Sequence, residues 1–443
     1  MLLDRDERGS RRTRRRDRRR VIARASRVLA LAAALTIAAA LATAGTALAS
    51  GGGAPLGGPT STTPASRASN PLQARAMWIW ELGSTDGGDL PAIIARAKHY
   101  GVTTVFVKSS DGSHYWSDQF TPALVRTLHA SGLKVCAWQY VYGGVPVKEA
   151  DLGAQAVRDG ADCLMIDAEA QYQGRYIAAQ TYVQRLRSLI GYRYPVALAG
   201  FPYVDLHPAF PYSVFLGPGG AQYNAPQMYW RSIGTSVSAV YAHTYAYNEI
   251  YQRPIFPTGQ LSANPPSEQI ERFRELSRAY GAGGVSWWDW QSASNSSWEA
   301  MSRPVGDLRG FTPQKAMAVI GRGASGDVVV WAQEHLISAG FPVEVSGQFK
   351  DRTYNQVVAF QARHGLQPDG EIGPETWAAL LRFKPVHVDW TANPVSATAD
   401  RLRTAAAAAR ASARTPAVTL PVPVSASEHA RRNEIPGSLG AGR

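Results

Sequence analysis

Short apolar segments alternate with amphipathic helical segments from Ala76 to Trp290, and this alternation constrains the fold more than any other feature of the chain. Strand–helix alternation predicts a parallel sheet whose crossover connections are right-handed. A left-handed helix cap followed by a short loop requires a glycine between helix and strand. Four helical segments stop at such a glycine just before the next apolar segment, at Gly101, Gly132, Gly160 and Gly281.

Eight predicted strands in a segment of this length match a closed (β/α)₈ barrel, also called a TIM barrel. The alternative is a doubly wound open sheet, but the turn after Trp80 lacks the Gly-rich phosphate loop of such folds. We therefore predict an α/β barrel over residues 74–304, whose fifth unit, 203–220, is a long loop with three prolines that directly follows Pro202. The predicted strands are 76–80, 103–108, 134–140, 162–169, 195–201, 221–230, 254–260 and 283–290.

The fourth predicted strand ends in two acids, where aliphatic residues would be the norm. Because side chains alternate along a strand, Asp167 and Glu169 should point the same way, about 6.6 Å apart at Cα. Two carboxyl groups on one face suit general acid/base chemistry. The alternative is a pair of acids that only solvates the strand end.

Active sites of (β/α)₈ barrels lie at the carboxyl ends of the strands, and here those ends are rich in aromatic, amide and acidic residues. Aromatic faces stack on sugar rings, and amides hydrogen-bond to hydroxyl and N-acetyl groups. We therefore expect a glycan-binding cleft around Asp167 and Glu169. Its candidate substrate-binding residues are Trp78, Trp80, Lys108, Gln139, Tyr140, Tyr203, Gln227, Tyr229, Gln260, Trp288, Asp289 and Trp290.

The Asp-x-Glu strand end, the Gln227-Met228-Tyr229-Trp230 segment and the Trp-rich last strand resemble (β/α)₈-barrel glycoside hydrolases. Lysozyme-type muramidases with an Asp-x-Glu strand are the nearest in character, and chitinase-type enzymes are similar. The longer Asp-x-x-Asp-x-Asp-x-Glu pattern of chitinases is interrupted here by Leu164 and Met165. The resemblance implies that Glu169 donates a proton, with its pKa raised by the Asp167 charge and by partial burial. Asp167 would stay ionised and stabilise the transition state or orient a substrate N-acetyl group.

Residues 315–383 form a second predicted domain of three short helices joined by Gly turns. Asp369-Gly370-Glu371-Ile372, followed by Thr376, echoes Ser346-Gly347-Gln348-Phe349, followed by Thr353. Together with Phe360-Gln361-x-x-His364-Gly365-Leu366, the pattern resembles the small peptidoglycan-binding domain of bacterial cell-wall enzymes. One departure is Ser346, where the first turn usually has Asp. A helical bundle without a glycan role is the alternative.

The first 49 residues read as a secretory signal peptide, with an Arg-rich start, an apolar stretch and Thr46-Ala47-Leu48-Ala49 before the cleavage site. Arg18-Arg19-Arg20 also loosely fits a twin-arginine signal, and an uncleaved anchor is the alternative. We expect cleavage after Ala49, a flexible linker over 50–73, and a low-complexity, disordered tail over 384–443. The mature protein is then secreted and associated with the cell wall.

The net charge of +12 does not indicate nucleic-acid binding, because 12 Arg and four acids in residues 1–27 account for +8 of it. The histidines show no ligand-type spacing, so we expect no metal or other cofactor and exclude a zinc amidase. The predicted partner is peptidoglycan, with no nucleic acid, no membrane after cleavage, and a monomeric state. Cys136 and Cys163 could form a disulfide or remain buried thiols.

We therefore expect an exported hydrolase of peptidoglycan glycosidic bonds that is anchored to the wall by its C-terminal domain. The alternatives are a non-catalytic peptidoglycan-binding barrel and a glycosidase that acts on another polysaccharide.

Overall fold

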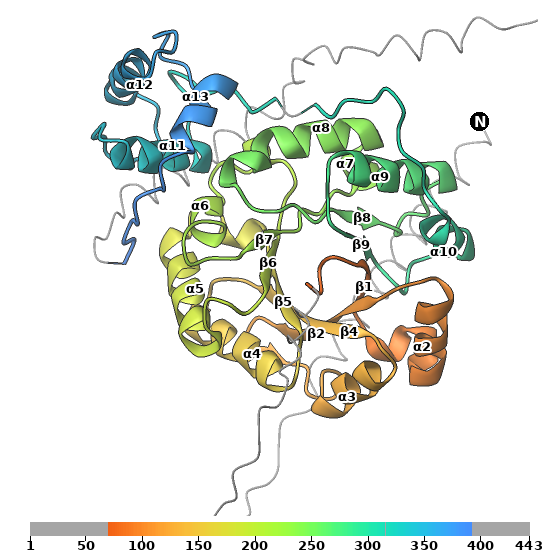
Figure 1. Ribbon diagram of the computed structural model, residues 1–443. Helices are drawn as coiled ribbons and strands as arrows, with labels where there is room; N and C mark the ends of the chain where they lie inside the picture. Colours follow the sequence, from red (N-terminus) through yellow and green to blue (C-terminus); the bar gives the residue numbers. More distant parts are fainter. Residues whose placement is uncertain (1–69, 315, 392–443) are drawn as a thin grey trace, which may run out of the picture. The chain divides into compact units, whose positions relative to one another are not determined.

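The computed structural model describes residues 70–314 and 316–391, and the first of these segments contains a ring of parallel strands. The strand order is β7-β6-β5-β4-β2-β1-β9-β8. Two isolated parallel bridges, Asn224–Ile255 and Gln227–Thr258, join the β7 and β8 segments at the two ends of this order. Helices lie outside the ring (Figure 1). The predicted α/β barrel fold is confirmed.

Each strand of the ring pairs in parallel with its neighbours, and only the two-residue β3 is antiparallel, pairing with β2 in a hairpin. The strands are β1 (Arg75–Ile79), β2 (Thr104–Asp111), β3 (His114–Tyr115), β4 (Lys134–Val141), β5 (Cys163–Ala168), β6 (Val196–Ala199), β7 (Tyr223–Asn224), β8 (Thr258–Gln260) and β9 (Val285–Trp288).

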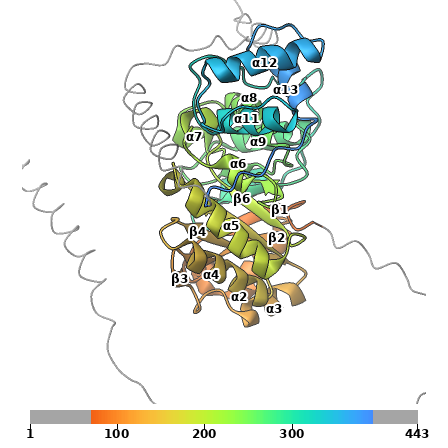
Figure 2. The same cartoon turned by 90° about the vertical axis from the view of Figure 1, so that its left-hand side faces the viewer.

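The outer helices alternate with the strands, as predicted. Figure 2 shows α4 and α5 next to each other outside the strands. All four predicted cap glycines adopt positive φ, between 65° at Gly101 and 106° at Gly160. The fifth unit holds only two short helices, the three-residue η4 (Val204–Leu206) and the four-residue α6, as its prolines predicted. The helices are α2 (Leu90–His99), α3 (Pro122–Ala130), α4 (Pro146–Arg158), α5 (Tyr176–Ile190), α6 (Tyr212–Phe215), α7 (Trp230–Ile233), α8 (Val237–Asn248), α9 (Ser267–Ala279) and α10 (Asn295–Ser302).

The predicted strand 221–230 is far shorter in the structure than in the sequence pattern, with only two residues in β7. Pro226 has no N–H to donate to the ladder. The backbone then bends through tight turns, in which Met228 N–H donates to the Pro226 carbonyl and Tyr229 N–H donates to the Gln227 carbonyl. Trp230 begins α7, so the polar residues of this segment leave the strand direction at the mouth of the barrel.

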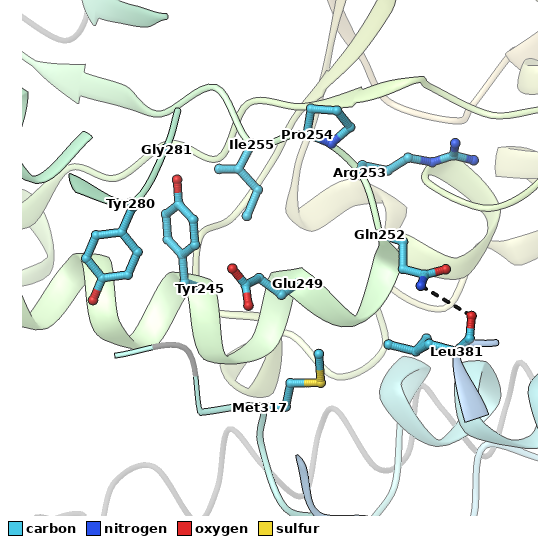
Figure 3. Close-up of a pocket in the computed structure, with 10 residues that line it drawn as sticks. All are labelled: Tyr245, Glu249, Gln252, Arg253, Pro254, Ile255, Tyr280, Gly281, Met317 and Leu381. Atoms are coloured by element: carbon cyan, nitrogen blue, oxygen red, sulfur yellow. Dashed lines mark hydrogen bonds between the residues drawn. The ribbon is translucent and has the colours of Figure 1, made fainter. Parts of the chain in front are cut away.

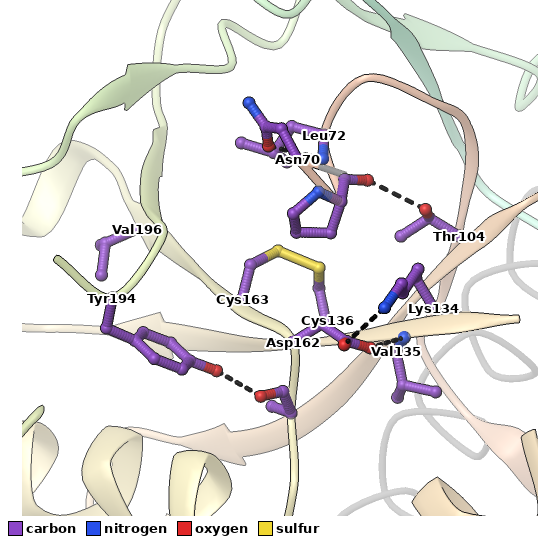
Figure 4. Close-up of a disulfide and its surroundings, with 12 residues drawn as sticks. Asn70, Leu72, Thr104, Lys134, Val135, Cys136, Asp162, Cys163, Tyr194 and Val196 are labelled. Atoms are coloured by element: carbon purple, nitrogen blue, oxygen red, sulfur yellow. Dashed lines mark hydrogen bonds and ion pairs between the residues drawn. A yellow bond between two sulfur atoms is a disulfide. The ribbon is translucent and has the colours of Figure 1, made fainter. Parts of the chain in front are cut away.

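The barrel interior is filled by a layer of large side chains and by a disulfide (Figure 4). Cys136 of β4 and Cys163 of β5 are register partners and are joined by that disulfide, which the sequence left open. Leu72 packs into the same interior cluster, and the Thr104 hydroxyl donates to the Pro71 carbonyl. Residues 70–73, which we assigned to the linker, therefore close the amino-terminal end of the barrel.

The C-terminal domain is a bundle of α11 (Asp327–Ser338), α12 (Asp351–Arg363) and α13 (Pro374–Leu380), which lie together in Figures 1 and 2. The two echoed turns are held by equivalent glutamines. Gln333 accepts from the N–H groups of Ser346 and Gly347, and Gln361 accepts from the N–H of Gly370. Each side-chain amide also donates to the threonine after its turn. The sequence echo therefore reflects a repeated structural unit.

Barrel and bundle belong to one compact unit and meet around Asp327, the first residue of α11. The Asp327 carboxylate is fully buried and accepts from the hydroxyls of Tyr176 and Tyr251. It also accepts from the hydroxyl and the N–H of Ser213. Beyond the bundle, Trp390 packs on the Tyr176 ring with 4.4 Å between the ring centroids.

Most of the predicted terminal segments fall outside the described residues, including the whole signal peptide, 1–49. Residues 384–391, which we placed in the disordered tail, are described, and Trp390 among them is buried. Within 70–314 and 316–391, no helix is long and apolar enough to cross a membrane.

Candidate active site

Asp167 of β5 and Glu169, which directly follows the last residue of β5, lie at the mouth of the barrel because they continue the alternation of the strand. Cys163 and Met165 belong to the interior cluster, so every second residue of β5 faces inward. Asp167 and Glu169 continue that series, with Asp167 buried and Glu169 half-buried. Asp167 therefore lies deeper in the mouth, and Glu169 is the carboxylate nearer to solvent.

One amide group connects the two carboxylates. The Nε2 of Gln227 donates to Asp167 Oδ1 at 2.9 Å and to Glu169 Oε1 at 3.2 Å. From β4, the Tyr140 hydroxyl lies 3.3 Å from Glu169 Oε2 and 2.9 Å from Gln171 Oε1. The pair is thus held by one side chain from the segment after β7 and by one from β4.

The two carboxyl groups differ in burial, and this affects the pKa of Asp167. Burial raises the pKa of Asp167 well above its ordinary value, and the negative charge of Glu169 raises it further. The charge of Lys108 and the hydrogen bond from Gln227 act in the opposite direction. We expected a raised pKa on Glu169. The structure shows a raised pKa on Asp167, which is the more deeply buried of the two.

Aromatic side chains surround the pair. Trp80 is 45% exposed and faces Trp288, with 6.3 Å between the ring centroids. On β4, the rings of Tyr140 and Tyr142 are 4.9 Å apart. Aromatic rings together with two carboxyl groups are components that sites for glycoside hydrolysis use.

Tyr229 and Asp289 extend the acidic region toward β9. Burial raises the pKa of the Tyr229 hydroxyl, and the charges of Asp167, Glu169 and Asp289 raise it further, so Tyr229 lies among all three acids. Asp289 is 3% exposed, and burial raises its pKa. Its Oδ1 atom has no hydrogen-bond partner among the described residues.

Several candidate substrate-binding residues do not reach the mouth. Gln139 has the opposite strand parity to Tyr140, and its amide donates to the Glu149 carbonyl of α4 in the outer shell. Gln260 is fully buried and accepts from the N–H groups of Arg231 and Ser232. The others are Trp78, which lies in the barrel interior, Trp290, which packs on Trp298, Tyr203, which stacks on His243, and Lys108, which is 4% exposed.

The sequence reasoning missed three residues of the site. Tyr142 follows Tyr140 at the same parity, a signal that was present in the sequence. Gln171 receives the hydrogen bond of Tyr140, and Trp116 lies beside Lys108 with its ring centroid 4.6 Å from the amine. Neither of these two belongs to a strand of the ring, so strand parity could not identify them.

A separate pocket of about 340 Å³ lies at the opposite end of the barrel (Figure 3). Pro254 and Ile255, which line it, precede β8, and Gly281 precedes β9. The Arg253 guanidinium, also in its lining, already donates to main-chain carbonyl groups. Because barrel active sites lie at the carboxyl ends of strands, this pocket is not the candidate site. Among the described residues there is also no cluster of three or more metal-ligating side chains.

Residues 325–380 match the family model described as "Putative peptidoglycan binding domain", which confirms the resemblance of the bundle. A peptidoglycan-binding protein from Clostridioides difficile is 46% identical over 15% of this chain and 41% of its own, with a TM-score of 0.15. The chain therefore spans less than half of that protein.

Two of the solved structures that are similar to the N-terminal region at low identity illustrate the likeness. A chitinase from Chromobacterium violaceum ATCC 12472 is 12% identical over 52% of this chain and 98% of its own, with a TM-score of 0.41. The spore cortex-lytic enzyme SleL from Bacillus cereus is 12% identical over 53% of this chain and 75% of its own, with a TM-score of 0.41.

Proposed function

We propose that this protein is an exported bacterial hydrolase that cleaves glycosidic bonds of peptidoglycan and is held at the cell wall by its C-terminal bundle. The observation that carries the proposal is the carboxylate pair, which shares one amide donor in an aromatic-lined barrel mouth. The match of residues 325–380 to a peptidoglycan-binding family supports the choice of substrate. An Arg-rich, then apolar, amino terminus supports export.

In the proposed mechanism, the two carboxyl groups share one proton. When a glycan covers the mouth, the proton moves to Glu169, the member that reaches solvent. Glu169 gives it to the glycosidic oxygen as the bond to the anomeric carbon breaks, and the leaving sugar departs as an alcohol. Both carboxylates are then ionised, and their charges stabilise the oxocarbenium-like transition state.

The spacing of the pair favours a retaining outcome. The nearest oxygens of the two carboxylates both lie within hydrogen-bond distance of a single nitrogen atom. They are therefore closer than the roughly 6.5–9.5 Å that an inverting pair needs to admit a water between sugar and base. The anomeric carbon would first be attacked by Asp167 or by the substrate's own N-acetyl oxygen. Water then completes hydrolysis and returns a proton to the pair.

The experiment that tests this function is digestion of purified bacterial sacculi by the mature protein, followed by mass analysis of the soluble fragments. We expect fragments with new reducing ends, and a reducing-end N-acetylmuramic acid would identify the lysozyme-like, muramidase bond. A reducing-end N-acetylglucosamine would identify the other glycosidic bond. Binding to sacculi without release of fragments would favour the non-catalytic barrel.

A further inference from the structure

Tyr142, which directly follows β4, has an exposed aromatic ring that several contacts hold in one position. The ring is 38% exposed, and its centroid lies 4.9 Å from that of the Tyr140 ring. The Tyr142 hydroxyl donates to Oδ1 of Asp111, the last residue of β2, at 2.9 Å. One edge of the ring packs on Gly112, where a β-carbon would lie only 3.0 Å from the Tyr142 Cδ2 atom. The ring is therefore fixed while part of it faces solvent.

A buried carboxylate holds the backbone of this loop. Glu149 of α4 is 1% exposed, and its Oε1 and Oε2 atoms accept from the N–H groups of Tyr142 and Gly143 at 3.1 and 3.0 Å. The same Oε2 atom accepts from the Tyr172 hydroxyl at 3.3 Å. Gly143 has a φ of 67° and packs on the Tyr172 ring, where a β-carbon would lie 2.9 Å from a ring carbon. Glu149 therefore joins the loop after β4 to the turn after β5.

Both sets of contacts lead from Tyr142 to Glu169. Tyr172 ends the 3₁₀ turn η3 (Ala170–Tyr172) that follows Glu169, and its N–H donates to the Glu169 carbonyl at 2.9 Å. Tyr140, whose ring neighbours that of Tyr142, has its hydroxyl 3.3 Å from Glu169 Oε2. The exposed ring is thus continuous with the carboxylate pair through side chains, and its loop is tied to the turn that follows Glu169.

We propose that Tyr142 is a sugar-binding platform, whose ring stacks on a pyranose ring of the glycan at a subsite adjoining Glu169. Glu149 is the positioning residue that keeps this platform at a fixed distance from Glu169. The subsite rests on the catalytic role given above to the carboxylate pair, and it extends the site along β4.

The contacts of Tyr142 favour a sugar as the occupant of this subsite. The hydroxyl is already bonded to Asp111, so the ring surface is what the side chain offers to a ligand. A ring that is fixed before binding loses little conformational entropy when a ligand stacks on it. Its continuity with the carboxylate pair, and the match of residues 325–380 to a peptidoglycan-binding family, identify that ligand as the glycan strand.

A binding measurement observes the Tyr142 ring directly and does not require activity. Full-length mature E169Q protein is labelled with ¹³C in its tyrosine rings, and the Tyr142 resonance is identified by its loss in Y142F. The probe is a tetrasaccharide of alternating N-acetylglucosamine and N-acetylmuramic acid. We expect the Tyr142 resonance to shift and that of Tyr192, exposed in the loop before β6, to stay in place. A Tyr142 resonance that does not move at millimolar tetrasaccharide overturns the subsite.

Steady-state kinetics on soluble peptidoglycan fragments separates the platform from its support. Tyr142→Ala removes the ring, so KM should rise about 10-fold with kcat nearly unchanged. Tyr142→Phe keeps the ring, so its KM should stay within about 3-fold of the wild type. Glu149→Gln turns one acceptor oxygen into an N–H₂ group that faces donors, so the loosened platform should raise KM by about 3–10-fold.

Asp327→Asn is the control for a purely structural effect, because Asp327 is also a buried carboxylate with several hydrogen bonds but lies outside the mouth. It should leave KM unchanged. An E149Q variant that is less stable but keeps the wild-type KM overturns the positioning role. If E149Q does not fold, Y142A still decides, because Tyr142 is at the surface. A wild-type KM in Y142A overturns the subsite even where the wild type cleaves glycan, whereas a shifted Tyr142 resonance without cleavage by the wild type supports the subsite and refutes the hydrolase.

Discussion

At the residue scale, Gln227 is the side chain that links the two carboxylates, whose negative charges repel each other. Its amide donates to both, and no other described side chain bonds to the two acids together. Hydrogen bonds to charged groups contribute about 1.5–3 kcal/mol each. The amide therefore has a large influence on the geometry of the pair.

Gln227→Leu keeps the approximate volume of the side chain and removes both hydrogen bonds. We expect kcat on soluble peptidoglycan fragments to fall by about 10–100-fold, because the carboxylates lose their common donor. Steady-state kinetics measures the change, and binding to sacculi should stay as in the wild type. A variant with wild-type kcat would show that the amide does not organise the reaction.

Trp80 offers the exposed ring best placed for a sugar, since it is 45% exposed and directly follows β1 at the carboxyl end of the strand. Trp80→Ala should raise KM about 10-fold and leave kcat nearly unchanged, because stacking on a sugar ring holds substrate and transition state equally. Tyr192→Ala is the control, because Tyr192 is 68% exposed but lies in the loop before β6, away from the mouth. Equal effects of the two substitutions would contradict a glycan platform at Trp80.

At the element scale, the sequence predicts the features that depend on a repeated or a local residue pattern. The cap glycines fixed four helix ends, and the parity of β5 placed Asp167 and Glu169 on one face. The same rule, applied to β4, would have separated Tyr140 from Gln139. Treating every residue near a strand end as a site residue ignored that alternation.

Other features were not predictable because they depend on the fold of distant segments. The shortening of β7 follows from Pro226, but the turns that aim Gln227 at the pair form only inside the closed barrel. Asp327 looks like an ordinary acid in the first turn of a helix. Its partners Tyr176, Ser213 and Tyr251 come from three other elements, so no local pattern reveals its burial.

Asp327 gives the first prediction at this scale. Asp327→Asn turns one acceptor oxygen into an N–H₂ group that faces donors. At pH 7, where the folded carboxyl group is ionised, the free energy of unfolding should therefore be about 2–4 kcal/mol lower than in the wild type. Asp351→Asn is the matched control, because Asp351 is also the first residue of its helix but is exposed and paired with Arg322. Urea unfolding measures both variants. A similar, small change in the free energy of unfolding of the two variants would show that the buried hydrogen-bond network contributes little to stability.

The second prediction at this scale concerns how the ionisation of Asp327 makes the free energy of unfolding depend on pH. Burial raises the pKa of Asp327 to about 6, above its ordinary value of 3.8, although four hydrogen bonds act to lower it. The folded state therefore binds the proton more tightly, and this contribution to stability is lost as the pH rises from about 4 through 6. The stability difference between wild type and D327N should accordingly narrow over that range in urea titrations. A difference in the free energy of unfolding that widens as the pH rises would contradict this prediction.

At the scale of the whole molecule, the barrel with its carboxylate pair and the bundle that matches a peptidoglycan-binding family occur in one compact unit. The buried contacts of Asp327, and of Trp390 beyond the bundle, connect the two parts directly. If the bundle binds the wall, the barrel mouth stays close to its glycan strands. Cleavage would then act on a substrate that the second domain keeps at high local concentration.

The most direct test compares reducing ends released from purified sacculi by the wild type, Glu169→Gln and Glu81→Gln. Glu81 is an exposed glutamate after β1, so it controls for the substitution itself. We predict that E169Q loses at least about 100-fold in rate, that E81Q keeps the wild-type rate, and that all three bind sacculi equally. Wild-type release by E169Q would contradict catalysis by the carboxylate pair.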